Sequence, residues 1–231
     1  MTQITSFNGF PKECSEFFNY LVTNNSRDWF NSHKSEYESY VLAPARSFVV
    51  AMGDRLSQIA PDIHAEPMID RSIFRIHRDV RFSTDKNPYK THLGIWLWQG
   101  EAPRMENSGF YFHLEQNTLM LGVGIYRFSQ LTLQKYRQAV INQQMGEKLD
   151  SAIASIAHKR NYSIGGLYYK RVPRGYDRNH KRAELLRYNG LSAAQETKIP
   201  DEFYSDKLIE YCFVRYSDML PIHQWLVDLT R

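Results

Sequence analysis

The sequence lacks the features that mark several classes of protein. Only two of its 231 residues are cysteines, and Cys14 and Cys212 match no metal or redox spacing, so we expect reduced thiols. Nowhere do 18 apolar residues follow one another, which excludes a predicted membrane span. The start, MTQITSFNGFPKE, has no basic region followed by an apolar run, so no signal peptide is predicted. We expect a soluble, cytoplasmic protein.

Most standard catalytic motifs are absent as well. The chain contains no GxxxxGK[ST], HExxH, CxxC or GxSxG, which removes the usual signatures of P-loop, zinc-protease, thiol-redox and α/β-hydrolase chemistry. GVGIYR, from Gly122, begins like a dinucleotide-binding loop but lacks the third glycine. The eight histidines are scattered. A metal site assembled from the distant His77, His113 and His180 is a less favoured alternative, and we expect neither metal nor cofactor.

The composition is that of an ordinary globular protein. Hydrophobic residues make up 42% of the chain and charged residues 23%, which argues against disorder. A chain of this length buries roughly 70% or more of the surface that its unfolded form exposes. We therefore expect one domain over residues 1–231. Fifteen tyrosines suggest a half-wet surface, because tyrosine combines an apolar body with a polar tip.

The order of hydrophobic patterns predicts an α+β fold. Apolar residues at helical spacing predict helices over residues 11–60, and again over 130–159 after a good N-cap at Ser129. Residues 70–127 are predicted to be mostly strands, 162–190 a strand and a basic turn, and 201–231 helical. Because no βαβ alternation occurs, we expect a mainly antiparallel sheet with N-terminal and C-terminal helices packed on it.

A hairpin at residues 109–126 is the clearest local prediction. GFYFHLE and TLMLGVGIY are separated by Gln116 and Asn117, a workable two-residue turn. One predicted face is wholly apolar, whereas the other carries Tyr111, His113 and Glu115 beside two glycines. Glycine inside a strand often marks the close approach of a ligand or of another backbone. His113 is therefore a candidate general acid or base, and a hydrogen-bonded structural histidine is the alternative.

Positive charge is concentrated in two segments. Residues 71–92 hold six Lys or Arg and two Asp, and residues 170–187 hold seven Lys or Arg, one Asp and one Glu. These 13 positive and 4 negative side chains give +9, and since the whole chain has a net charge of +4, the remainder is at −5. A mildly acidic body with two basic segments suggests a local anion site more than general adhesion to nucleic acid.

The first basic segment contains RIHRDVRFSTDKNPYKTH, residues 75–92. Alternation predicts a strand over residues 74–82, because successive side chains of a strand point to opposite faces. The mostly apolar face comprises Phe74, Ile76, Arg78, Val80 and Phe82. The charged face comprises Arg75, His77, Asp79 and Arg81. Arg78 is the exception on the apolar face, and we expect Asp79 or Asp85 to supply the carboxylate that a buried guanidinium needs.

A polar pocket is the favoured interpretation of this segment, and a solvated edge strand is the alternative. Arginine presents forked donors that suit phosphate or carboxylate, and the NPY turn can aim Lys86 and Lys90 in the same direction. Asp79 could orient these cations and is a second, tentative catalytic candidate beside His113. The predicted ligand-binding residues are Arg75, Arg78, Arg81, Lys86, Tyr89, Lys90, Tyr111, Lys170, Arg171, Arg174 and His180.

Three functions stay open on the residues alone. The leading hypothesis is a basic pocket that binds an anionic small molecule, phosphate-bearing or carboxylated, with or without an enzymatic step. A nucleic-acid-binding module is the second, because Tyr168, Tyr169 and Tyr176 interleave with the second basic segment and could stack on bases. The third is a structural or interaction protein in which the charges pair internally. The sequence predicts no oligomeric state.

Four stretches resemble the family called domain of unknown function 2461, which is found mainly in bacteria and fungi. They are NNSRDWFNSHKSEYE, FRIHRDVRFSTDKNPYKTHLG, GFYFHLEQNTLMLGVGIY and YKRVPRGYDRNHKRAELLRYNGL. The resemblance implies one compact α+β unit and no settled activity. It draws attention to Arg75, Arg78, Asp79, Arg81, Asp85, Lys86, Tyr89 and Lys90. One departure is GIYRFS, where the family pattern leads us to expect a proline shortly after the aromatic residue.

Overall fold

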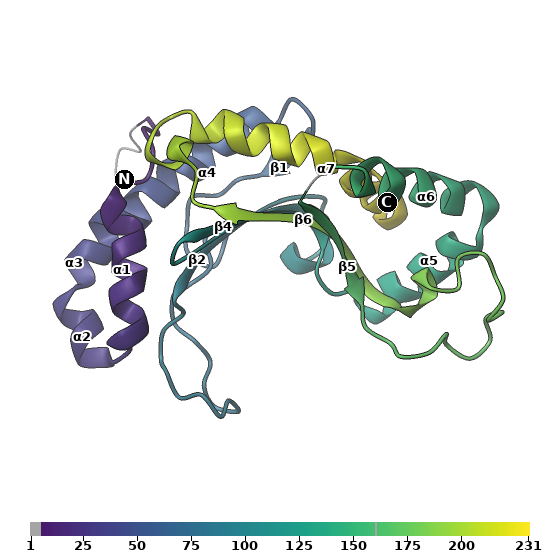
Figure 1. The fold of residues 1–231 in the computed structure, drawn as a ribbon, viewed down its shortest axis with the longest axis horizontal. Coiled ribbons are helices and arrows are strands. Elements are labelled where there is room, and N and C mark those ends of the chain that lie inside the picture. The colour runs from purple at the N-terminus through teal and green to yellow at the C-terminus, as the bar shows by residue number, and fades with distance from the viewer. Residues whose placement is uncertain (1–5, 160) are drawn as a thin grey trace. The chain divides into compact units, whose positions relative to one another are not determined.

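The computed structural model describes residues 6–159 and 161–231 (Figure 1). Its α-helices are α1 (Lys12–Thr23), α2 (Arg27–Ser32), α3 (Lys34–Glu36), α4 (Ala43–Leu56), α5 (Gln130–Ile141), α6 (Gln143–Ala157) and α7 (Leu208–Thr230). Its strands are β1 (Ile63–His64), β2 (His92–Gln99), β3 (Gly109–Glu115), β4 (Thr118–Ile125), β5 (Tyr162–Leu167) and β6 (Tyr188–Lys198). A π-helical stretch, η1 (Tyr37–Leu42), joins α3 to α4, and the 3-10 helices are η2 (Arg104–Glu106), η3 (Leu185–Arg187) and η4 (Asp201–Tyr204).

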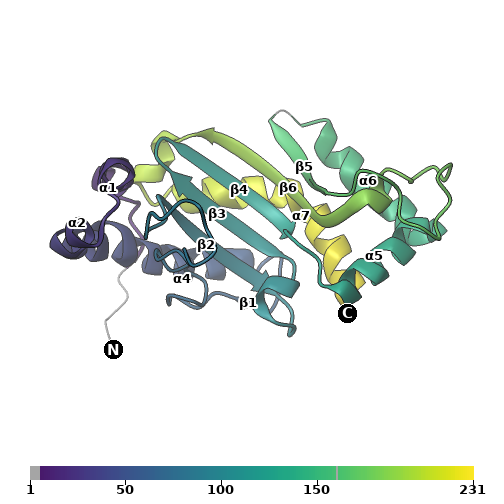
Figure 2. The ribbon, with the colours of Figure 1, turned by 90° about the horizontal axis from the view of Figure 1, so that it is seen from below.

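The six strands form one antiparallel sheet in the order β1-β2-β3-β4-β6-β5, and helices pack on it. Figure 2 shows β2, β3, β4 and β6 running side by side. The predicted α+β class, with helices on a mainly antiparallel sheet, is confirmed. None of the helices in the described part of the chain is long and apolar enough to cross a membrane.

Contacts divide the chain into two compact units. Unit 1 comprises residues up to 97, 111–121 and 196–214, and unit 2 comprises residues 98–110, 122–195 and 215–231. Strands β2, β3, β4 and β6 and helix α7 each contribute residues to both units. A single domain over residues 1–231 stays a prediction, and each unit is described by itself below.

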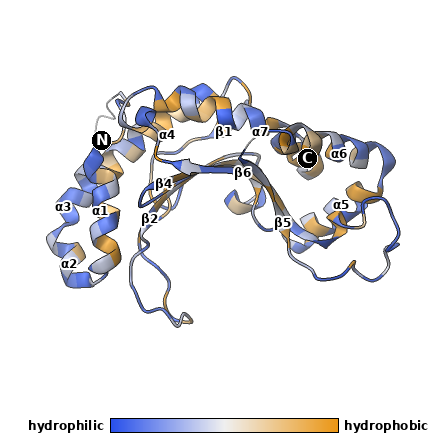
Figure 3. Cartoon of the chain, viewed as in Figure 1, coloured by the Kyte–Doolittle hydropathy of each residue, from blue (hydrophilic) through white to orange (hydrophobic). Residues whose placement is uncertain are grey.

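Unit 1 is built around a cluster of phenylalanines. The Phe10 ring is buried, and its centroid lies 4.9 Å from that of Phe203 and 5.7 Å from that of Phe112. Phe48, from α4, lies 4.8 Å from Phe112. The Phe10 amide also donates a hydrogen bond to the Phe203 carbonyl. Segments from the start, middle and end of the sequence therefore meet in one aromatic core, and the hydropathy pattern behind it can be followed in Figure 3.

Unit 2 is held together by buried polar contacts as well as by apolar packing. The Trp225 indole donates to the Met145 carbonyl at 2.9 Å, which ties α7 to α6. The Tyr136 hydroxyl donates to the Leu185 carbonyl at 3.0 Å. The predicted N-cap at Ser129 is present, because its hydroxyl accepts from the Thr132 amide. A side-chain oxygen satisfies a helix-end amide that has no partner within the helix.

The predicted hairpin is present, with β3 and β4 joined by the two residues Gln116 and Asn117. Along β3, Phe112 and Leu114 are buried, whereas Tyr111, His113 and Glu115 are partly exposed, as the alternation predicted. The glycine at 124 serves another backbone: a Cβ added there would lie 2.2 Å from the Leu191 carbonyl oxygen of β6. Its φ of +131° also favours glycine.

The predicted strand over residues 74–82 was wrong. The segment forms only isolated bridges, Ile73 with Ile95 and His77 with Tyr89. Phe82, expected on the apolar face, is 95% exposed. The physical reason is that the backbone of this segment pairs with the residues that follow it and not with a long strand. The Arg78 amide donates to the Pro88 carbonyl, and the Lys90 amide donates to the Ile76 carbonyl.

Candidate functional site

The arginines of the first basic segment mostly have carboxylate partners. Arg78 contacts Asp85, one of the two acids predicted for it. Arg81 forms a forked pair with Asp79, Nε to Oδ1 at 2.9 Å and Nη2 to Oδ2 at 2.7 Å. Hydrogen bonds from Arg81 lower the pKa of Asp79. The charge of Arg75 also acts on this carboxylate, which lies at an exposed position of the loop.

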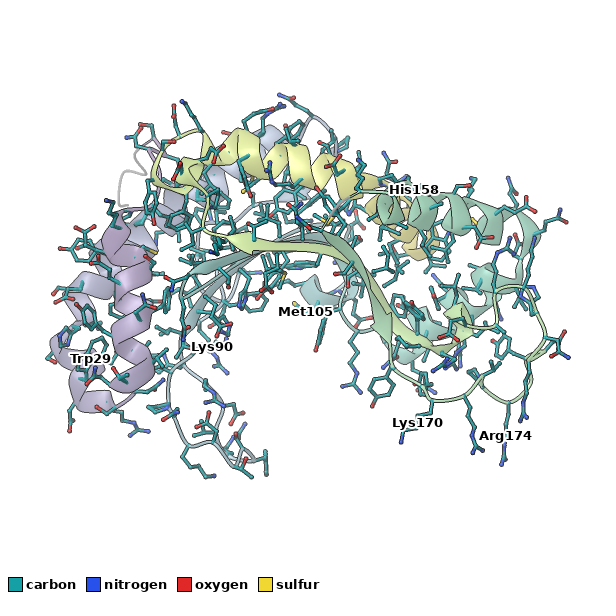
Figure 4. The ribbon with its side chains drawn as sticks, viewed as in Figure 1. Trp29, Lys90, Met105, His158, Lys170 and Arg174 are labelled. Carbon is teal, nitrogen blue, oxygen red and sulfur yellow. The ribbon has the colours of Figure 1, made fainter. Side chains whose placement is uncertain are left out.

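The two lysines of this segment bind carbonyls of their own loop. Lys86 Nζ donates to the Val80 carbonyl at 3.1 Å, and Lys90 Nζ donates to the Arg75 carbonyl at 2.8 Å. Lys90 also lies 5.5 Å from the centroid of the Phe74 ring. The Lys90 contact joins the two ends of the loop between residues 76 and 90, and the Lys86 contact lies within it. The loop can be found beside Lys90 in Figure 4.

Tyr89 anchors this loop to the helical part of unit 1. Its ring is buried and stacked on Phe30, with centroids 4.2 Å apart. The Asn25 side chain accepts from the Tyr89 amide and donates to the Tyr89 carbonyl, both at 3.0 Å. Tyr89 was predicted as a ligand-binding residue, and its ring belongs to the core.

Beside this anchor lies a cavity of about 430 Å³ within unit 1. It is lined by Val22, Asn25, Arg78, Asp85, Asn87, Tyr89, Lys90, Thr91, His92 and Gln116. Three of the predicted site residues, Arg78, Tyr89 and Lys90, are thus brought together. The lining does not include the predicted residues Arg75, Asp79, Arg81 and Lys86, nor Tyr111 and His113 of the hairpin.

Arg78 keeps part of its guanidinium available to the cavity. Nη1 contacts Asp85 and donates to the Asn87 carbonyl at 3.3 Å. Within the described part of the chain, Nε and Nη2 make no hydrogen bond, and the side chain is 28% exposed. Guanidinium N–H groups suit carboxylate and phosphate oxygens.

A chain of polar side chains runs from the cavity wall into the hairpin. The Thr91 hydroxyl donates to Glu115 Oε1 at 3.4 Å, and Glu115 Oε2 lies 3.4 Å from His113 Nε2. On the other side, His113 Nδ1 lies 2.9 Å from the Tyr111 hydroxyl. A neutral His113 protonated at Nε2 satisfies both contacts, because Nδ1 then accepts the Tyr111 proton. Burial, followed by the charge of Glu115, raises the pKa of Tyr111 to about 12.

His92 lies between the cavity and this row of polar side chains. It lines the cavity, and its ring centroid is 4.4 Å from that of His113. Burial, followed by the charge of His113, lowers the pKa of His92 to about 4. The imidazole is therefore neutral at pH 7. His92, Thr91 and Asn25 were not among the residues predicted from the sequence. For His92, its place two residues after Lys90 at the start of a strand was the available signal.

The second basic segment belongs to unit 2 and is anchored by a buried arginine. Arg182 Nε donates to Asp150 Oδ2 of α6 at 2.7 Å. Lys181 lies 3.7 Å from Glu147 of the same helix. A Cβ on Gly146 would lie 2.4 Å from Arg182 Nη1, so only glycine leaves room for the guanidinium. The predicted His180 accepts from the Arg182 amide at 3.0 Å through Nδ1.

The remaining predicted residues of this segment are exposed. Lys170, Arg171 and Arg174 form no ion pair within the part of the chain that the structure describes. Figure 4 shows the Lys170 and Arg174 side chains extending away from the loop that joins β5 to β6. The alternative in which all charges pair internally therefore fits the first segment better than the second.

No group of three or more His, Cys, Asp and Glu side chains among the described residues is placed to hold a metal ion. Two histidines of the alternative metal site, His77 and His113, lie in unit 1, and the third, His180, lies in unit 2. The His77 ring instead lies 5.1 Å from that of Tyr89.

Comparison with known protein families identifies the family of this chain. A family model described as "Conserved hypothetical protein (DUF2461)" matches residues 13–225, which is most of the chain. No curated protein matches the sequence. The resemblance seen in the four quoted stretches is confirmed.

Proposed function

We propose that this chain, which belongs to the DUF2461 family, binds an anionic small molecule in the cavity of unit 1. The ligand would carry a phosphate or carboxylate group. The observation that carries the proposal is the cavity lining, which gathers a guanidinium, an ammonium, an imidazole and three carboxamides on one concave surface. Sites for small molecules are concave and place a few polar groups that fix the ligand's orientation.

Charge and hydrogen bonding in the lining favour an anion over a cation. Arg78 and Lys90 bring two positive charges and Asp85 one negative charge. The three charges sum to +1, and Asp85 is in contact with Arg78. Asn25 and Asn87 supply neutral hydrogen-bonding groups on the same wall. Hydrogen bonds in which one partner is ionised are about twice as strong as neutral ones.

The proposed acid or base work of His113 would reach a ligand through Glu115 and Thr91, because His113 itself does not line the cavity. His113 contacts Glu115, and Glu115 contacts Thr91 on the cavity wall. Glu115 therefore orients the imidazole in the way a carboxylate orients the histidine of a catalytic triad. The Tyr111 hydroxyl on the far side holds the tautomer through Nδ1.

Removal of the Lys90 charge tests the binding site. We expect Lys90→Met to weaken binding of inorganic phosphate or citrate about 10- to 100-fold, the value of a hydrogen bond to a charged group. Isothermal titration calorimetry of the full chain measures it. Lys86→Met is the matched control, because Lys86 lies on the same loop outside the lining. Equal loss in both variants, or no binding of either anion, would contradict the proposal. A purely structural role predicts lower stability with no anion binding.

Protonation of His92 gives a second, independent test. An anion beside His92 favours the imidazolium, so binding should take up a proton and strengthen as the pH falls from 7 to 5. Sulfate is the probe, because its charge does not change over this range. We expect affinity to rise by less than tenfold per pH unit, since one proton is involved. His113, Glu115, Lys90 and Arg78 also act on this imidazole. His92→Asn should flatten the profile, and an unchanged profile would assign the proton elsewhere.

A further inference from the structure

Unit 2 carries two exposed tyrosines that its core does not use. Tyr126, directly after β4, is 87% exposed, and Tyr168, directly after β5, is 65% exposed. Exposed cations neighbour both rings in the sequence: Arg127 follows Tyr126, and Lys170 and Arg171 follow Tyr168 and Tyr169. We call this set, together with Arg174, the tyrosine surface. The anion cavity of unit 1 contains none of its residues.

The two tyrosines flank the same end of β6. Strand β6 lies between β4 and β5 in the sheet. On one side, Leu167 pairs with Tyr188, and the Tyr168 amide donates to the Arg187 carbonyl at 3.1 Å. On the other, a Cβ on Gly190 would lie 2.2 Å from the Tyr126 carbonyl oxygen. Since neighbouring strands are about 4.8 Å apart and the offset from Arg187 to Gly190 adds about 10 Å along β6, the two backbone positions are separated by about 14 Å.

Strand alternation places Tyr126 away from the core. Val123 and Ile125 of β4 are buried, so the next residue in the alternation, Tyr126, points to the opposite face. Leu191 and Ala193 of β6 are also fully buried. Tyr188 and its partner Leu167 therefore belong to the same open face as Tyr126. Tyr126, Tyr188 and Leu167 thus lie on one side at the ends of three neighbouring strands. Tyr168 follows beyond the end of β5, where strand alternation no longer fixes the side, and its ring is exposed.

The cations of the tyrosine surface are not neutralised by neighbouring acids. Arg127, Lys170, Arg171 and Arg174 form no ion pair with the residues that the structure describes. The nearby Glu184 pairs with Arg187. Arginines 78 and 81 of the first basic segment, by contrast, each have an aspartate partner. The free positive charge therefore accumulates beside the exposed tyrosines.

The loop that carries these cations is held in place at both ends. Arg182 is buried against α6 through Asp150. At the other end, the Tyr169 amide donates to the Arg187 carbonyl, and Arg187 Nε donates to the Tyr169 carbonyl, both at 2.9 Å. The Tyr169 ring in turn lies under the guanidinium of Arg137, 5.0 Å away. Preorganised contacts of this kind lower the entropy cost of binding.

We propose that the tyrosine surface binds single-stranded nucleic acid. Bases would stack on the rings of Tyr126 and Tyr168, and phosphates would contact the Arg127, Lys170, Arg171 and Arg174 side chains. Stacking needs an unpaired base, because the base faces are covered in a duplex, and aromatic rings beside cations are the usual platform for single strands. A membrane surface would call for several large aliphatic or Trp and Phe side chains, whereas Leu167 is the single exposed aliphatic residue within this surface.

Fluorescence anisotropy of the full chain with labelled single-stranded DNA and RNA tests the proposal. We expect Tyr126→Ala and Tyr168→Ala each to weaken binding about 5- to 100-fold, as expected for the loss of one stacked base. Removal of a phosphate contact should act on the salt dependence instead. Arg171→Ala with Arg174→Ala should reduce the slope of log affinity against log salt by about 1.4, since each contact to a single strand contributes about 0.7.

Matched controls separate this surface from general charge effects. Tyr20→Ala removes a tyrosine that is exposed on α1 of unit 1, and Lys12→Ala removes an exposed lysine of the same helix, so both should bind as the unaltered chain does. No binding at low salt would overturn the proposal. So would duplex binding that ignores the tyrosines, or binding to anionic phosphatidylserine vesicles without oligonucleotide binding. These variants lie outside the anion cavity, so a negative result here would leave the proposed anion site untouched, and the reverse also holds.

Discussion

Phe10→Ala is expected to lower the free energy of unfolding by about 3–5 kcal/mol, the usual cost of truncating a buried phenylalanine. Phe10 has the rings of Phe7, Phe48, Phe112 and Phe203 around it, with centroid distances from 4.9 to 5.8 Å. The substitution leaves a cavity between segments that the chain order keeps far apart. Neighbouring rings fill such a cavity only in part, because close-packed interiors relax little.

Urea unfolding followed by circular dichroism measures this loss. Phe82→Ala is the matched control, since Phe82 is 95% exposed and should change stability by less than about 0.5 kcal/mol. If Phe10→Ala and Phe82→Ala had equal effects, the aromatic cluster would not be the centre of the unit 1 core. An unchanged slope with urea would show that the substitution changes stability alone, because that slope follows the surface exposed on unfolding.

The second large effect expected is a loss of stability in mild acid through His223. Its ring is buried in unit 2, where Nδ1 lies 2.9 Å from the Ser108 hydroxyl and Nε2 lies 2.9 Å from Gln99 Oε1. These contacts suit a neutral imidazole that donates once and accepts once. Burial lowers the pKa of His223 to about 4.

The direction in which stability changes with pH follows from proton binding. Between pH 6.5 and about 4 the unfolded chain binds a proton at His223 that the folded chain does not, so acid favours unfolding. The contribution is complete above pH 6.5 and is lost as the pH falls to about 4, a total of about 3 kcal/mol at 1.36 kcal/mol per pKa unit. Urea unfolding at pH 4, 5, 6 and 7 measures the curve.

A variant that cannot titrate isolates this contribution. His223→Gln should be less stable at pH 7, where it loses ring packing, but should lose less stability between pH 7 and pH 4. His92→Asn is the necessary comparison, because burial also lowers the pKa of His92 to about 4 and it acts over the same window. A His223→Gln curve parallel to that of the unaltered chain would show that this imidazole does not drive the acid sensitivity.

Much of the fold follows from short-range patterns. The β3–β4 hairpin was predicted because alternation and a two-residue turn act over neighbouring residues. Strand β6 was missed, although it is eleven residues long. Its buried residues include the small Gly190 and Ala193, which give a weak apolar signal. Its partners, β4 and β5, are separated along the sequence by two helices, and such pairing has no local signature.

In the candidate cavity, too, a contact between residues close in sequence was predicted, whereas one between distant residues was missed. The Arg78 contact with Asp85 was among those predicted, because seven residues of one loop separate the two. The bond between Asn25 and Tyr89 joins residues 64 positions apart and had no sequence signal. Similarly, the alternation over residues 74–82 predicted a strand that did not form, because it carries no information about what the backbone pairs with. Backbone pairing depends on which edge is free in the folded chain.

The positions of the two basic segments, the hairpin and the helical stretches could be read from the order of residues. Which cations keep their charge available could not, because ion pairing depends on distance through space and on the medium between the charges. In the first segment, Asp79 and Asp85 pair with arginines of their own loop. In the second, α6 supplies the acids that take Lys181 and Arg182. Folding thereby leaves the exposed cations beside the tyrosines, where the sequence showed only an even run of charge.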